Sequence, residues 1–415
     1  MWRALVTGWK NVDLTEAQWL EVLNTLRESQ PILGPVTYEV SDLLEKGVNK
    51  ATHRIPMAHL SLSVSLSEML WHVVVASSEE KHRDEADDWL LEAINHPAGS
   101  LLTFRLHVLS ILREAAGENW AKIPSEHKSF LESVLAGTSY AASIGRVLIA
   151  SQLYFLFNLE QVWTVRNVVP LFNWATNERA IQAWHGFLVW GRWNESLLPH
   201  VLPCFEQAMP FLHAKFGREQ RRSFCQFLAG IACYGSPDPV QGGWLDRFLR
   251  QVSLEERIIW CSSMSATLKG MKDPLPENAW RNWISIYWQN RIDGVPTPLE
   301  VGEITEMVEW ALAFKVSFPE VAEKIYRSPM PKAEHRFLYN ELSESEITKL
   351  HPKEAATLVL YLLKVDFTPV YWFDPLIKIV QDLRGFEDAK PVLRQICGEL
   401  ARLGYPRAGN LRDTI

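Results

Sequence analysis

The sequence has few cysteines, and they follow no recognisable pattern. Five occur among 415 residues, and no two form a CxxC pair; they are Cys204, Cys225, Cys233, Cys261 and Cys397. The absence of a CxxC pair excludes the usual zinc-finger and dithiol redox motifs, and an odd, scattered set argues against a disulfide framework. We therefore expect buried, free thiols in a reducing compartment, with the cytoplasm as the location.

Long apolar runs and an excess of positive charge are also lacking. The first ten residues contain no apolar core of the length a signal peptide needs, and the most apolar run, residues 147–157, is too short to cross a bilayer. The formal net charge is −7, so there is no general surplus of Lys and Arg to neutralise phosphates. The sequence predicts no membrane partner and disfavours nucleic acid.

Motifs that carry catalysis are missing as well. The sequence contains no GxxxxGK[ST] phosphate loop, no GxGxxG turn, no GxSxG elbow and no HExxH pair. Two HxxE strings, 82–85 and 351–354, are interpreted as surface helix residues, and the acidic residues of 79–88 as a solvated first helical turn. His96, in the string Asn95–Gly99, is interpreted as a loop or capping residue. We predict no catalytic, cofactor or metal site, and a protein that is not an enzyme.

Aromatic residues and helical periodicity are abundant. The chain has 18 Trp, 18 Phe and 10 Tyr, spread over segments whose apolar residues recur at helical spacing, such as 180–188, 224–231, 304–314 and 373–383. Residues 61–67 alternate between Ser and apolar residues, but they lie in a longer stretch, 56–75, with a helical pattern. The sequence predicts an all-α protein.

A weak internal repeat suggests how these helices are arranged. Val168-Val169-Pro170-Leu171-Phe172 is echoed by Val201-Leu202-Pro203-Cys204-Phe205, at a spacing that matches one helix pair of a helical-repeat protein. We predict a HEAT-like α-solenoid that is irregular at its ends; an irregular helical domain is the alternative. The predicted segments are 1–80, an N-terminal helical segment; 81–330, the repeat region; and 331–415, a C-terminal helical cap.

Two clusters are candidates for binding a protein partner. Trp190, Arg192 and Trp193 form one, because Trp and Arg dominate recognition hot spots. Arg218, Arg221 and Arg222 form the densest basic cluster and could contact a phosphate or an acidic partner. The competing interpretations are core packing for the tryptophans, including Trp280, Trp283 and Trp288, and a solvated helix start after Gly217 for the arginines.

Four strings in order resemble a known family. They are AINHPAG at 93–99, RVLIASQL at 146–153, AWHGFLVWGRW at 183–193, and YWQNR at 287–291, the last followed by Gly294-Val295-Pro296. Together they resemble the C-terminal helical region of sirtuin-linked anti-phage defence proteins, a domain family without an assigned activity of its own. The resemblance runs from near residue 80 almost to the C-terminus.

The resemblance implies a role in defence. In such proteins an N-terminal sirtuin-like domain hydrolyses NAD when infection is sensed, and the helical part senses, restrains or assembles. No Gly-rich NAD loop precedes residue 80, and none of the matching positions is catalytic, so no catalytic residue is carried over. The resemblance implies either that this chain is a fragment of a longer protein or that the effector is encoded separately.

Three hypotheses about function follow. The first is a non-enzymatic scaffold or sensor of bacterial defence that binds a phage protein or an NAD-hydrolysing effector. The second is a general α-solenoid adaptor unrelated to immunity. The third is a cryptic hydrolase or nuclease whose acids converge from different helices. A homo-oligomer is compatible with the first two.

Overall fold

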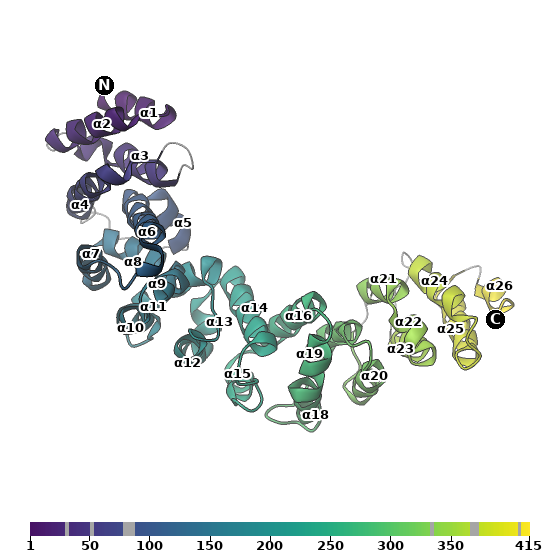
Figure 1. Cartoon of the computed structure of the whole chain (residues 1–415). Coiled ribbons are helices and arrows are strands. Elements are labelled where there is room, and N and C mark those ends of the chain that lie inside the picture. The colour runs from purple at the N-terminus through teal and green to yellow at the C-terminus, as the bar shows by residue number, and fades with distance from the viewer. Residues whose placement is uncertain (30–32, 50–53, 78–87, 333–335, 366–372, 406–407) are drawn as a thin grey trace. The chain divides into compact units, whose positions relative to one another are not determined.

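Figure 1 shows the computed structural model of the chain, which describes residues 1–415 apart from 30–32, 50–53, 78–87, 333–335, 366–372 and 406–407. Every regular element among the described residues is a helix, and no strand occurs among them. The predicted all-α class is therefore confirmed. The chain divides into two compact units, Met1–Ala208 (unit 1) and Met209–Ile415 (unit 2). The predicted segment limits near residues 80 and 330 lie inside these units and stay predictions.

Unit 1 is built from short helices joined by tight turns. The helices are α1 (Trp2–Asn11), α2 (Glu16–Glu28), α3 (Thr37–Asn49), α4 (Leu60–Ser77), α5 (Trp89–Asn95), α6 (Pro97–Ala116), α7 (Ser125–Ala136), α8 (Tyr140–Ser151), α9 (Leu153–Leu159), α10 (Gln161–Asn167), α11 (Asn177–Trp190) and α12 (Leu198–Ala208). Between them lie the 3₁₀ turns η2 (Gly34–Val36), η3 (Met57–His59), η4 (Gly117–Asn119) and η5 (Val169–Phe172).

Polar side chains fix where several of these helices begin. Thr15 and Gln18 form a capping box at α2, and Ser139 caps α8 by accepting from the Ala142 N–H. His96 precedes α6, and its Nδ1 accepts from the Ala98 N–H at 3.1 Å. Each cap satisfies backbone donors that the first helical turn leaves free. The predicted capping role of His96 is confirmed.

The helices of unit 1 pack in sequence order. α3 packs on α6, α6 on α8, and α8 on α11 (Figure 1). The middle helix, α8, is buried along its length from Ala141 to Ser151. Arg146 of α8 is 3 % exposed and donates to Gln182 of α11 at 2.7 Å and to the Gly137 carbonyl at 2.7 Å. These charge-assisted bonds connect α8 to α11 and to the turn that precedes α8.

Unit 2 continues with short helices. It contains η6 (Met209–Phe211), α13 (Leu212–Lys215), α14 (Arg218–Tyr234), α15 (Trp244–Gln251), α16 (Leu254–Gly270), α17 (Leu275–Ala279), the π-helix η7 (Trp280–Ile284), α18 (Ser285–Ile292), α19 (Val301–Met307), the 3₁₀ helix η8 (Val308–Ala313), α20 (Phe318–Arg327), α21 (Arg336–Glu344), α22 (Ile347–Leu350), α23 (Pro352–Val365), α24 (Phe373–Leu383), α25 (Lys390–Arg402) and α26 (Ala408–Arg412). α14 packs on α16, α16 on α19, α20 on α23, and α23 on α25.

Tryptophans form the core of unit 2. Trp260, Trp280, Trp288 and Trp310 are all at most 1 % exposed. Trp310 lies edge-to-face with Trp260 at 5.9 Å and with Trp288 at 5.7 Å between ring centroids. Trp288 donates its indole N–H to Ser328 at 3.0 Å and Trp310 donates to the Cys261 carbonyl at 2.8 Å, whereas the buried Trp260 Nε1 has no hydrogen-bond partner among the described residues. The core-packing interpretation of Trp280, Trp283 and Trp288 is therefore confirmed.

The helical predictions agree with the structure except where packing shortens a helix. The alternating string 61–67 lies inside α4, and the stripe at 180–188 lies inside α11. The stripe at 304–314 is split into α19 and the 3₁₀ helix η8. The two repeat strings take different local structures, a 3₁₀ turn and part of α12, yet Phe172 and Phe205 both pack edge-on against Trp184, at 5.0 and 4.8 Å.

All five cysteines are free, and four of them are buried. Burial raises the pKa of Cys204 and of Cys233 to about 12, and raises those of Cys225, Cys261 and Cys397 as well. At pH 8 the thiols are therefore protonated and poorly nucleophilic. We expect Ellman's reagent to react slowly with the native chain and to titrate five thiols once guanidinium unfolds it. Fast reaction of one native thiol would contradict this burial.

Among the residues that the structure describes, one helix, Met57–Ser77, is long and apolar enough by composition to cross a membrane, and 44 % of its apolar window is buried. The segments Ser125–Ala136 and Tyr140–Ser151 pass the same test only together, across a bend of 116°. Core helices of globular proteins have the same composition, and α4 packs on α2, α3 and α6. The absence of a membrane partner and the cytoplasmic location stay predictions.

Candidate functional site

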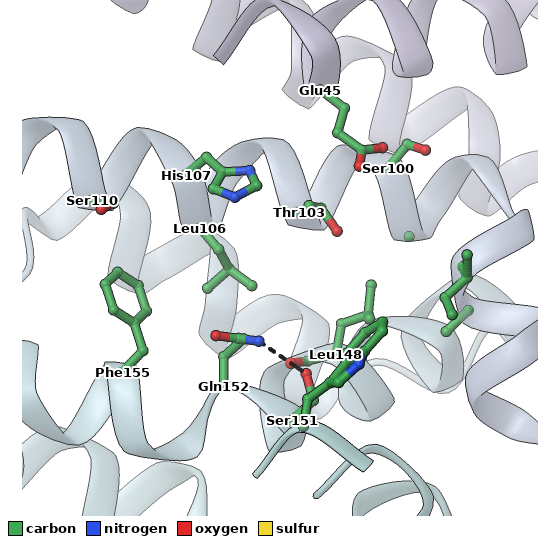
Figure 2. Close-up of a pocket in the computed structure, with 14 residues that line it drawn as sticks. Glu45, Ser100, Thr103, Leu106, His107, Ser110, Leu148, Ser151, Gln152 and Phe155 are labelled. Carbon is green, nitrogen blue, oxygen red and sulfur yellow. Dashed lines mark hydrogen bonds between the residues drawn. The ribbon is translucent and has the colours of Figure 1, made fainter. Parts of the chain in front are cut away.

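A cavity of about 310 Å³ lies within unit 1, between α3, α6 and α8 (Figure 2). This volume is at the lower end of the range for small-molecule sites. Its polar lining includes Glu45, Ser100, Thr103, His107, Ser151 and Gln152. Its apolar lining includes Ile94, Leu106, Leu148, Phe155 and Trp190. The lining therefore offers both hydrogen-bonding groups and aromatic and aliphatic surface.

Helix α6 supplies most of the polar wall. Ser100, Thr103 and His107 recur at helical spacing, so they share one face of α6, and Figure 2 shows them in a row along it. Gly99 lies beside them, where a Cβ would come within 1.8 Å of the Ala93 carbonyl oxygen. Glycine at this position lets α5 and α6 approach closely, which brings Ile94 of α5 to the cavity.

Helices α3, α8 and α9 complete the cavity. Glu45 extends from α3 toward the row of α6, as Figure 2 shows. On the other side, Gln152 and Phe155 point toward α6. Gln152 donates from Nε2 to the Ser151 hydroxyl at 3.5 Å, and that hydroxyl donates to the Leu148 carbonyl at 2.7 Å. The amide oxygen of Gln152 is left as an acceptor in the cavity.

The electrostatics of the cavity are dominated by one carboxyl group and one imidazole. Burial raises the pKa of Glu45, a hydrogen bond with Ser100 opposes this, and the nearby Asp42 adds to it. Burial, with a smaller effect of Arg54, lowers the pKa of His107, so its ring is neutral at pH 7. The Nδ1 atom of His107 is buried and has no hydrogen-bond partner among the described residues. An unpaired polar atom of this kind is costly unless something binds to it.

Four exposed apolar residues lie on α5 and α11, and two of them line this cavity. Trp190, at the end of α11, is 44 % exposed and also lines the cavity, and its neighbour Val189 is 56 % exposed. Ile94 and Leu91 of α5 are 50 % and 57 % exposed, and α5 packs against α11. These four residues, which we call the apolar rim, form a surface suited to contact with a ligand or a partner.

The structure places the six predicted binding residues in different settings. In unit 1, Trp190 belongs to the cavity and the apolar rim, Arg192 is exposed and Trp193 is half-buried. In unit 2, Gly217 precedes α14, and Arg218 and Arg222 are exposed in its first turns. The interpretation of this segment as a solvated helix start fits these two arginines. Their binding of a partner stays a prediction.

Arg221 is engaged within unit 2. Its side chain is 12 % exposed, and its Nη1 donates to Glu255 at 2.8 Å and to Glu256 at 2.7 Å. Burial raises the pKa of Glu256, but hydrogen bonds from Ser253, Arg221 and His213 outweigh it and the pKa is lowered overall. Arg221 therefore stabilises the packing of α14 on α16.

His213, Glu255 and Glu256 form a cluster that sequence reasoning missed. One ligand atom from each lies within 4.8 Å of the others, a spacing that a metal ion could use. The guanidinium of Arg221 already forms an ion pair with both carboxylates, and His213 Nδ1 is 3.3 Å from Glu256 Oε1. This cluster is explained as an ion-pair network.

Other predicted features find ordinary roles. Nε2 of His351 lies 2.8 Å from the Lys315 carbonyl oxygen, and its ring stacks on Phe318. The string 82–85 and all but the last acid of 79–88 lie outside the described residues. That last acid, Asp88, caps α5 by accepting from the Leu90 and Leu91 N–H groups.

A second hollow of about 510 Å³ includes Glu132, Arg166 and Arg179 in its lining. Glu132 accepts a hydrogen bond from the Trp163 indole at 2.8 Å.

Comparison with known proteins matches one part of the chain. Residues 236–400 match a family model described as a domain of unknown function (DUF4020). This segment lies in unit 2, so the match does not include the cavity of unit 1. No curated protein and no solved structure matches the chain. The resemblance to sirtuin-linked defence proteins stays a prediction.

Proposed function

We propose that the chain is a non-enzymatic, HEAT-like helical scaffold or sensor region of a bacterial anti-phage defence system. It binds a phage protein or a partner protein and controls an NAD-consuming, sirtuin-like effector that is a separate domain or chain. The family resemblance of residues 93–99, 146–153, 183–193 and 287–291 motivates the defence role. The packing of the helices supports the scaffold role.

The observation that carries the scaffold proposal is the limited sequence separation of the long-range hydrogen bonds, which extend up to 49 residues, for Trp310 with Cys261. Lys10 bonds to Asp42, Arg146 to Gln182, and Trp288 to Ser328, at separations of 32, 36 and 40 residues. Bonds from Trp280 to Glu320 and from Lys269 to Glu309 also span 40 residues. Helical repeats of the HEAT type are about 40–47 residues long, and each repeat contacts mainly its neighbours.

Surfaces that could contact a partner occur in both units. In unit 1 the apolar rim combines an exposed tryptophan with exposed aliphatic residues. In unit 2 Arg218 and Arg222 are exposed near the start of α14. Trp and Arg are the residue types that most often dominate binding energy at protein interfaces. Partner binding by either surface is consistent with a protein that acts through contacts.

NAD consumption tests the proposal. The purified chain would be mixed with a sirtuin-like protein encoded beside it or fused to it, before and after addition of phage lysate. We expect NAD to be consumed only when both the sirtuin-like protein and the lysate are present, and the chain to change that rate. Reactions with each protein alone are the controls. NAD consumption by this chain alone would contradict its non-enzymatic role.

Capture of the partner by variants identifies the surface. We expect Trp190→Ala to weaken capture if unit 1 makes the contact, and Arg222→Ala to weaken it if unit 2 does. Arg250→Ala, which removes an exposed arginine of α15, is the matched control. If the chain captures a protein but never alters NAD consumption in any combination, the general adaptor replaces the defence role.

A further inference from the structure

The cavity of unit 1 has an unusual balance of charge. Glu45 is the only acidic or basic residue that lines it, His107 being neutral at pH 7, and Glu45 makes no ion pair among the described residues. Two cations of unit 1 pair with other carboxylates: Lys46, whose charge also acts to lower the pKa of Glu45, lies 3.4 Å from Asp42, and Arg54 lies 4.0 Å from Glu114. A half-buried carboxylate that no cation contacts directly among the described residues favours a positive ligand.

Two further polar atoms of the cavity can accept hydrogen bonds from a ligand. The unpaired Nδ1 of His107 can accept a hydrogen bond in one neutral tautomer, and the amide oxygen of Gln152 also faces the cavity. The side chains of Phe155 and Trp190 supply aromatic faces that attract cations. The cavity therefore offers a carboxylate, further acceptors and aromatic rings to one ligand.

We propose that this cavity binds an organic cation, a guanidinium or primary ammonium group on a short carbon chain. Glu45 is the counter-ion, His107 and Gln152 accept from further N–H groups, and the carbon chain packs on Phe155 and Trp190. The cation is either a free small molecule or an arginine or lysine side chain of a partner protein. This inference does not depend on the proposed role in defence.

A matched pair of probes tests the proposal. Butylguanidinium and butylurea have nearly the same shape, but only the first is charged. Their binding to the full chain would be measured by saturation-transfer NMR and by calorimetry. We expect butylguanidinium to bind at least about tenfold more tightly than butylurea, because a charged hydrogen bond to a carboxylate is about twice as strong as a neutral one.

Variants place the binding in this cavity. We expect Glu45→Gln to reduce butylguanidinium binding about tenfold while leaving butylurea binding unchanged. Glu118→Gln removes the same charge from an exposed position and is the matched control. Trp190→Ala should weaken both probes. Circular dichroism melts establish that each variant is folded.

The possible outcomes separate clearly. Equal binding of the two probes, an unchanged affinity in Glu45→Gln, or no binding of butylguanidinium by the folded wild-type chain would overturn the proposal. The peptide acetyl-Leu-Arg-Leu-amide identifies the source of the cation. Tighter binding of the peptide than of butylguanidinium supports a partner's side chain, because the leucines can contact the apolar rim. Equal or weaker binding of the peptide supports a free small molecule.

Discussion

Gly186→Ala is expected to destabilise unit 1 by about 3 kcal/mol, the upper end of the usual cost of overpacking. Gly186 lies where α11 crosses α8. A Cβ at this position would be 2.0 Å from the Val147 carbonyl oxygen and 3.2 Å from its Cγ1. The oxygen belongs to the backbone of a buried helix, so the two helices must move apart to admit the methyl group. Hydrogen exchange of peptides from α8 and α11 would measure the loss of stability.

A Gly→Ala substitution at a helical glycine with no neighbouring atoms should instead increase stability. Gly8 lies within α1 of the same unit, and a Cβ there meets no atom within 4 Å. Gly8→Ala should therefore stabilise α1 by about 0.5–1 kcal/mol, since alanine loses less conformational entropy in a helix. Equal stability of the Gly186→Ala and wild-type chains would show that α8 and α11 are not held at this distance.

Glu303→Ala is expected to destabilise unit 2 by about 3–5 kcal/mol, because it leaves a buried cation without its partner. Arg291 and Glu303 are both 0 % exposed, and Arg291 Nη2 lies 2.8 and 2.7 Å from the two carboxylate oxygens. Glu303 also accepts from the Glu300 N–H, which caps α19. Urea unfolding, with hydrogen exchange of peptides from α18 and α19, measures the loss.

Two further variants distinguish the loss of the buried ion pair from the loss of side-chain atoms alone. Glu306→Ala removes a half-buried carboxylate from the same helix and should cost less than about 1 kcal/mol. Arg291→Met combined with Glu303→Leu removes both charges and should recover part of the loss. Recovery stays incomplete because Arg291 also donates to the Thr297 and Pro298 carbonyl oxygens. If Glu303→Ala unfolds like Glu306→Ala, the pair does not support unit 2.

The helices were predictable from sequence because their signals are local. Apolar spacing identified α11 and α14, and longer context rightly identified α4 despite its alternating serines. The change from α19 to the 3₁₀ helix η8 was not predictable, because the apolar stripe continues through both and only packing against α16 and α20 distinguishes them. The π-helix at Trp280–Ile284 has no local signal either.

The cavity could not be predicted, because its residues come from distant parts of the chain. Glu45 and His107 belong to no motif, and Gln152 lies in the string 146–153, which assigns it no role. Only the stacking of α3 on α6 and of α6 on α8 brings the three residues together. Trp190 alone was identified in advance, from its residue type. Arg221 was predicted as a binding residue because it lies in a basic cluster. The sequence does not reveal that Glu255 and Glu256, which are distant along the chain, already form ion pairs with it.

The sequence separation of the long-range hydrogen bonds also predicts how the chain unfolds. Most of these bonds join helices about one repeat apart, as for Lys10 with Asp42 and Trp288 with Ser328. If the bonds between two adjacent helix pairs break, those pairs lose stability, but helices farther along the chain stay folded. This behaviour is expected when each repeat interacts mainly with its neighbours. Thermal unfolding would then occur in several transitions, one group of helices at a time. A bound ligand would stabilise only the helices next to its site.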